Sequence, residues 1–206
     1  MKRILHYLLG GAWLGWFGLI TAAAGIPQEA LWISGEGGYE TYRIPAIAVS
    51  NEGTLLAFCE GRVESRSDTG NIDLLLKRST DHGNTWTEQM VVWDDGANTC
   101  GNPSPVVDPA TGTIWLFGTW NLGTDKEQDI IEGNSTDTRR VYVMSSTDDG
   151  LSWSEPREIT ATTKKPDWTW YATGPGSGLV VSKGSHAGRL MVACDHIEAV
   201  SKEYRS

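Results

Sequence analysis

A short polar stretch, residues 60–73, gathers side chains in this sequence that could do chemistry. It carries two guanidinium groups, on Arg62 and Arg66, and the carboxylate of Asp68, and apolar runs at residues 55–59 and 74–76 flank it. A planar guanidinium binds a carboxylate through two parallel hydrogen bonds, and a carboxylic acid can pass a proton to a leaving oxygen. The stretch could therefore bind an anion and perform acid–base chemistry if strands hold it as a loop, although solvated loops have the same composition.

The elements that would position this loop are indicated by an internal repeat. Residues 79–86, STDHGNTW, recur as residues 146–153, STDDGLSW, with five of the eight positions identical. An aspartate that bonds the amides ahead of it, a glycine able to adopt a positive φ and a buried tryptophan suit a hairpin turn between strands. The pattern S-x-D-x-G-x-x-W is the Asp box of β-propellers, so we expect an all-β fold.

Apolar runs between the turn signals predict groups of four strands, the blades of a propeller. The first blade is expected at residues 44–49, 54–59, 72–76 and 89–93, and the second at 104–107, 113–120, 141–144 and 157–159. A third begins at 179–182 and 189–194, whereas the charged segment 121–139 is interpreted as a long loop. Because propellers usually have about four to eight blades, the chain is expected to be truncated.

The first 24 residues have the pattern of an export signal. A short basic start precedes an almost wholly apolar run at residues 4–20 and the small residues 22–24, although an uncleaved membrane anchor over residues 4–24 has the same pattern. Cleavage would remove Lys2 and Arg3 but no acid, so the net charge of −9 would fall to −11. Such a charge disfavours nucleic acid and anionic membranes as partners. We expect a protein that is exported to the periplasm or secreted.

Three cysteines are too few and too scattered for a disulfide framework. Cys59 falls within an apolar run and is expected to be buried and inert, but one disulfide plus one free thiol among Cys59, Cys100 and Cys194 remains possible. No spacing of cysteine, histidine or acid indicates a metal site.

The tetrapeptide at residues 42–45, Tyr-Arg-Ile-Pro, precedes the first blade. Together with the Asp boxes it resembles the sialidase (neuraminidase) family, whose members share an (F/Y)RIP motif, and the resemblance runs from about Trp32 to the end of the chain. It implies a six-bladed β-propeller, present here as roughly two and a half blades over residues 25–206. It also implies hydrolysis of terminal α-linked sialic acid with retention of configuration, sialylated glycoprotein, glycolipid or oligosaccharide substrates, and no cofactor.

The same resemblance assigns roles to the polar residues. It places Arg43 and Arg62 on the carboxylate of the sugar and makes Asp68 the catalytic acid and base, with Arg66 and Asp73 as rivals within the loop. Arg62 is preferred because it directly follows a predicted strand. The tyrosine nucleophile of the family, its glutamate partner and a third arginine have no counterpart here. We therefore expect this chain alone to be inactive.

Three further residues are weaker candidates for substrate contacts. Asn102 fits a position that contacts the sugar, although an Asn-Pro turn explains it equally well. Trp120 could line an N-acetyl pocket or belong to the core. His196, near the end of a third-blade strand, could face the site or be an ordinary surface or core histidine. The alternative function is a non-catalytic Asp-box propeller that binds glycan or protein.

Overall fold

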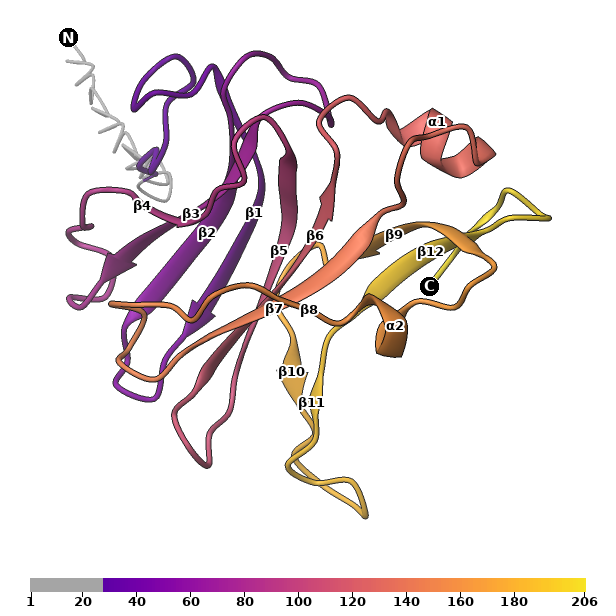
Figure 1. The fold of residues 1–206 in the computed structure, drawn as a ribbon. Coiled ribbons are helices and arrows are strands. Elements are labelled where there is room, and N and C mark those ends of the chain that lie inside the picture. Colours follow the sequence, from indigo (N-terminus) through magenta and orange to yellow (C-terminus); the bar gives the residue numbers. More distant parts are fainter. Residues whose placement is uncertain (1–27) are drawn as a thin grey trace, which may run out of the picture.

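The computed structural model describes residues 28–206, so the expected export signal at residues 1–24 lies outside the described residues. Within this range, no helix combines the length and apolar character needed to cross a membrane. The first blade is an antiparallel meander of β1 (Thr41–Val49), β2 (Leu55–Arg62), β3 (Ile72–Ser79) and β4 (Met90–Trp93), as the sequence predicted. Figure 1 shows it beside the second blade.

The second blade repeats this meander with β5 (Thr99–Val107), β6 (Ile114–Asn121), β7 (Arg140–Ser146) and β8 (Arg157–Glu158). A parallel pairing of Ile72 with Thr99 joins β3 to β5, so both blades belong to one sheet. Alternate residues of a strand point to one face, and those faces of the two blades meet in a common core. Its buried members are Ala46, Leu56, Phe58, Leu74, Leu76, Trp93, Cys100, Ile114, Leu116 and Met144.

The third group of strands differs from the sequence prediction. Its main sheet consists of β9 (Trp168–Thr173), β12 (Cys194–Glu198) and β13 (Tyr204–Arg205), while β10 (Leu179–Val180) and β11 (Leu190–Met191) form a separate hairpin. Strand β9 was not predicted, although its run of aromatic and β-branched residues is typical of a strand. The structure therefore holds two complete four-stranded blades and part of a third, consistent with a partial propeller.

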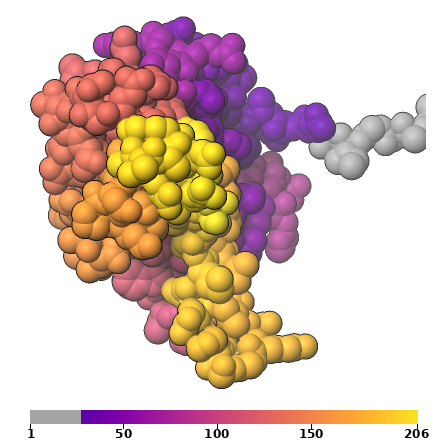
Figure 2. Space-filling view, turned by 90° about the vertical axis from the view of Figure 1, so that its right-hand side faces the viewer, coloured from indigo at the N-terminus to yellow at the C-terminus, as the bar shows by residue number. Residues whose placement is uncertain are grey.

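The interpretation of residues 121–139 as a featureless loop is wrong, because this segment contains helix α1 (Glu127–Glu132). Ile130 and Ile131 of α1 pack with Trp170 and Ile197 in a small core of their own, which supplies the apolar burial that a short helix needs. A second helix, α2 (Thr160–Thr163), follows β8. Figure 2 shows the yellow C-terminal residues seated beside the segment that carries α1, where the Lys202 ammonium donates to the Ile131 carbonyl at 2.6 Å.

The two repeated octapeptides fold into the same turn. In the first, Asp81 accepts hydrogen bonds from the Thr85 hydroxyl at 2.6 Å and the Thr85 amide at 2.9 Å; in the second, Asp148 accepts the equivalent pair from Ser152. These bonds lower the pKa of both carboxyls to about 2. The second turn also reaches back to the first blade, since Arg78 of β3 donates to the Asp149 carboxylate at 2.7 Å.

All three cysteines are free, with Cys59 and Cys100 buried as expected for Cys59. Burial raises the pKa of both of these thiols, so they are poor nucleophiles.

Candidate active site

The first strands of both blades carry the same irregularity. In β1 the pairing register shifts between Arg43 and Ala46, and in β5 between Gly101 and Ser104. At each shift a residue before proline has a positive φ, 53° at Ile44 and 55° at Asn102. A positive φ is rare for a β-branched residue such as Ile44, and such strained bulges re-aim neighbouring side chains beside functional sites.

The two bulges open onto one cavity of about 270 Å³ at the meeting point of the three strand groups. Four of the six residues that the sequence singled out, Arg43, Arg62, Asp68 and Asn102, line it together. Its complete lining is Arg43, Ile44, Glu60, Arg62, Asp68, Thr99, Asn102, Glu127, Arg139, Trp170, Ala172, Asp195 and Tyr204.

Arg62, at the end of β2, is the buried centre of the site, with 2% of its side chain exposed. Four of its five N–H groups make hydrogen bonds, and the guanidinium also forms an ion pair with Asp68. Nε and Nη2 donate to the Glu60 carboxylate, Nη2 also reaches Asp68 at 2.8 Å, and Nη1 donates to the carbonyls of Arg66 and Ser67 at 2.8 and 2.7 Å. Because the Arg62 guanidinium is bound both to Glu60 and to two carbonyls of the loop that follows it, it fixes the path of that loop.

Asp68 sits at the mouth of the cavity, where its carboxylate bridges two arginines. Its Oδ1 lies 2.7 Å from Nη1 of Arg43 and 2.8 Å from Nη2 of Arg62. The side chains of Asp68 and Arg43 are 51% and 39% exposed, so both face solvent, in contrast to Arg62. An anion entering the cavity can therefore reach Arg43 without disturbing the buried pair behind it.

Glu60 holds the inner wall together. It is buried, accepts two hydrogen bonds from Arg62, and accepts the backbone N–H of Asn102 at 2.8 Å, which ties the first blade to the bulge of the second. Glycine at position 101 leaves room for the Glu60 carboxylate, because a Cβ there would lie 2.7 Å from Oε1 of Glu60. The carboxylate is thus committed to structure rather than left for chemistry.

A third arginine, Arg139, lies buried in the wall with 3% exposure. It donates to the side-chain carbonyls of Asn121 and Asn102, and its guanidinium lies 4.3 Å from the Trp170 ring. Among residues 28–206 it has no carboxylate within ion-pair distance, and its Nε finds no hydrogen-bond partner there. Burial lowers its pKa to about 10, so it remains a cation at neutral pH. This positive charge is available to a ligand anion.

The opposite rim is acidic. The Tyr204 hydroxyl donates to the Glu127 carboxylate, and burial together with that carboxylate raises the pKa of Tyr204. Burial and Glu127 likewise raise the pKa of Asp195. A tyrosine held protonated in this way is not activated as a nucleophile.

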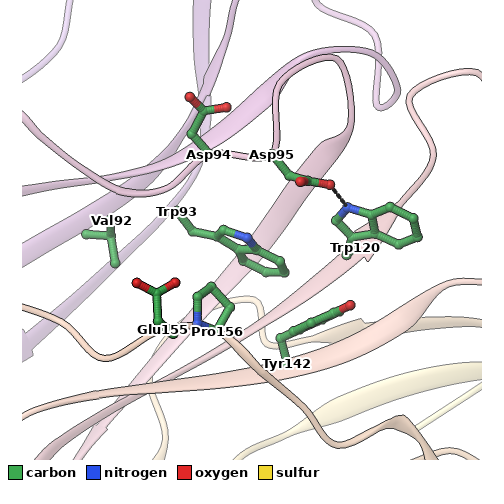
Figure 3. A pocket seen from close by; sticks show the side chains of 8 residues that line it. All are labelled: Val92, Trp93, Asp94, Asp95, Trp120, Tyr142, Glu155 and Pro156. Carbon is green, nitrogen blue, oxygen red and sulfur yellow. Dashed lines mark hydrogen bonds between the residues drawn. The ribbon is translucent and has the colours of Figure 1, made fainter.

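Two predicted substrate contacts lie elsewhere. Trp120 lines a separate cavity with Trp93 and Tyr142 (Figure 3), and its indole N–H donates to Asp95 at 2.7 Å. His196 stacks on the Trp168 ring at a centroid distance of 3.6 Å and does not line the site.

The two rivals within the loop also have structural contacts. Arg66 contributes its carbonyl to the Arg62 guanidinium, and Asp73 accepts the Tyr39 hydroxyl at 2.6 Å.

Sequence reasoning missed Glu60 and Arg139. Glu60 lies two residues before Arg62 on one strand, so the strand period of two places both on the same face. Arg139 directly precedes β7, where strand alternation does not apply, so the sequence carried such a signal for Glu60 but not for Arg139.

Comparison with known proteins shows the family of this chain. The family model described as "BNR repeat-like domain" matches residues 53–205. An exo-alpha-sialidase of Aspergillus fumigatus is 36% identical over 164 residues, which cover 71% of this chain and 40% of the fungal protein. A sialidase of Micromonospora viridifaciens is 37% identical over 180 residues, covering 80% of this chain and 26% of the bacterial protein.

Solved structures give the same picture. The Hadza microbial sialidase Hz136 superposes with a TM-score of 0.72 at 31% identity, covering 81% of this chain and 34% of that protein. A leech intramolecular trans-sialidase reaches the same TM-score at 16% identity, over 84% of this chain and 43% of its own, and so shares the fold. The chain spans less than half the length of each of these proteins. It belongs to the BNR repeat-like domain family, and it resembles sialidases over most of its own length.

Proposed function

We propose that this chain supplies part of the active site of an exo-alpha-sialidase, which removes terminal α-linked sialic acid from glycoproteins, glycolipids or oligosaccharides. The observation that carries the proposal is the Asp68 carboxylate, held between Arg43 and Arg62 at the mouth of a cavity with a further buried cation, Arg139. Sialic acid bears a carboxylate on its anomeric carbon, so an anion site must adjoin a proton donor. The sialidases to which the chain is similar support the substrate class.

The Arg43–Asp68 ion pair couples substrate binding to catalysis. The substrate carboxylate takes over the Arg43 guanidinium, and Asp68 loses one of its two cationic partners. The proposed role requires Asp68 to enter this step as the carboxylic acid. The protonated acid then transfers that proton to the glycosidic oxygen as the bond to the anomeric carbon breaks, and the resulting carboxylate later accepts a proton from the attacking water.

Arg62 and Asn102 act as supports in this scheme. Arg62 orients Asp68, because its guanidinium pairs with that carboxylate and is itself held by hydrogen bonds to Glu60 and to the loop carbonyls. Asn102 presents its side chain beside Arg139, where it can contact a substituent of the sugar ring.

The test compares two leaving groups in the full-length protein. We expect Asp68→Asn to lower kcat on sialyllactose, whose leaving alcohol needs a proton, by about 10²- to 10⁴-fold. The loss on an aryl sialoside, whose phenolate leaves unaided, should be much smaller. Asp167→Asn, at an exposed aspartate before β9 that does not line the cavity, is the matched control. Equal losses on both substrates would show that Asp68 is not the acid.

Export of the protein is part of the same proposal, because sialylated glycoconjugates lie outside the cytoplasm. Residues 1–24 would be removed in the process. A measured mass that retains these residues in the cell-associated protein would instead favour an anchor.

A further inference from the structure

A second cavity, of about 400 Å³, lies in the groove between the two complete blades. It is lined by the end of β4, by Trp120 at the end of β6, by Tyr142 of β7 and by Glu155 and Pro156 before β8. It shares no lining residue with the active-site cavity. Its size falls in the range of about 300–1,000 Å³ that is usual for small-molecule sites.

Three aromatic rings surround this space, as Figure 3 shows for Trp93, Trp120 and Tyr142. The centroids of the Trp93 and Tyr142 rings lie 4.8 Å apart at an interplanar angle of 50°, so the two rings pack against each other on one side of the cavity. Trp93 is only 7% exposed, whereas Trp120 and Tyr142 are partly exposed. The face of an aromatic ring attracts a cation that lies over it.

The charge of the lining is wholly negative. Asp94, Asp95 and Glu155 are exposed carboxylates of this cavity, and no lysine or arginine is among its lining residues. Asp95 is fixed by the indole N–H of Trp120 at 2.7 Å and by the Asn98 side chain at 2.8 Å, whereas the Glu155 carboxylate makes no hydrogen bond within residues 28–206. A cation is the ligand that these charges favour.

The Trp120 ring already takes part in one cation–π contact. The Arg140 guanidinium lies 5.9 Å from its centroid, held there by Asp137 and Glu158, and Arg140 does not line the cavity. The cavity thus remains open to a second, mobile cation.

We propose that this groove binds a methylated or quaternary ammonium group, with Trp93, Trp120 and Tyr142 as the aromatic walls and Asp95 and Glu155 as the counter-charges. The inference stands apart from the proposed sialidase activity, since no active-site residue enters it.

Titration with choline at constant ionic strength, followed by tryptophan fluorescence, tests this site. We expect saturable binding with a dissociation constant on the order of millimolar. Tyr142→Leu should weaken it by about two- to thirtyfold, the range of one cation–π contact. Glu155→Gln, on the surface and safe for folding, should weaken it by about two- to fivefold. Glu52→Gln, which removes an exposed carboxylate away from the groove, should leave binding unchanged.

The uncharged isostere 3,3-dimethyl-1-butanol separates charge from shape, and we expect it to bind much more weakly than choline. Phosphatidylcholine vesicles that sediment the wild-type protein but not the Tyr142→Leu variant would support the site and assign its ligand to a lipid headgroup. The proposal would be overturned if the isostere bound as tightly as choline, or if galactose bound more tightly than choline. It would also be overturned if both Tyr142→Leu and Glu155→Gln bound choline with the wild-type affinity.

Discussion

Replacing Glu60 by glutamine removes one charge from the inner wall of the active site without changing its shape. The Glu60 side chain is 4% exposed and its partner Arg62 is 2% exposed, so the two charges neutralise each other away from water. Glu60 accepts two hydrogen bonds from Arg62 and a third from the backbone N–H of Asn102.

Glutamine cannot reproduce all three bonds. If the glutamine amide nitrogen takes the place of Oε2, its N–H groups face the N–H donors of Arg62. If the amide nitrogen takes the place of Oε1, its N–H groups face the backbone N–H donor of Asn102. Either orientation leaves a buried donor unsatisfied, at a cost of about 1–3 kcal/mol, and the guanidinium loses its buried counter-charge. Breaking a buried pair from one side costs about 3–5 kcal/mol, so we expect Glu60→Gln to destabilise the fold by that amount.

Urea unfolding of four proteins measures this coupling: wild type, Glu60→Gln, Arg62→Met and the double variant. Because the double variant contains no unpaired buried charge, its free energy of unfolding should exceed the additive expectation by about 2 kcal/mol. Glu158→Gln is the matched control, since its pair with Arg140 is exposed and should contribute at most about 1 kcal/mol. Additive costs within about 0.5 kcal/mol would refute the buried pair as the support of the Asp68 loop.

Two further substitutions test other parts of the fold. Burial raises the pKa of Asp73 from 3.8 to about 6, so the folded state binds the proton of this carboxyl more tightly than the unfolded chain does. The resulting contribution to the free energy of unfolding is no more than about 3 kcal/mol. It is present below about pH 4 and is lost as the pH rises through 6. Asp73→Asn should therefore remove that decline from urea midpoints measured between pH 4 and 6, and an unchanged decline would contradict the assignment. Arg78→Met removes two hydrogen bonds to Asp149 that join the blades and should lower the free energy of unfolding, measured by thermal unfolding, by about 1–3 kcal/mol. Arg157→Met, at an exposed arginine, should lower it little. Equal losses in the two variants would show that this contact between the blades is unimportant.

The strands and turns of the two complete blades could be predicted from the sequence because their signals are local. Hydrophobic alternation and the repeated octapeptide both act within a few residues, and the two Asp81 and Asp148 turns form almost the same hydrogen bonds. The proximity of Arg62 and Asp68 was also predictable, since they share one loop and its neighbouring strand, whereas Arg43 was placed beside them through the sialidase resemblance.

Features set by distant packing were not predictable in the same way. Helix α1 depends on burial of Ile130 and Ile131 against Trp170, which lies almost 40 residues later in the chain. The direction of Trp120 depends on where β6 ends relative to β4, and this turns the ring into the groove between the blades instead of the active site. The role of Arg62 in holding the loop was likewise not predictable, because it depends on the carbonyls of Arg66 and Ser67, which reach the guanidinium only in the folded loop.

The proposed function depends most on the binding of a sialic acid carboxylate by Arg43 at the mouth of the cavity. Its most direct test is the affinity of the protein for N-acetylneuraminic acid and for the methyl ester of the same sugar, measured by NMR titration in the wild type and in Arg43→Gln. Because a charge-assisted bond is worth about 1.5–3 kcal/mol, the acid should bind the wild type at least about tenfold more tightly than the ester. We expect this affinity advantage of the acid over the ester to disappear in Arg43→Gln. An advantage that persists in the variant would show that Arg43 does not bind the carboxylate.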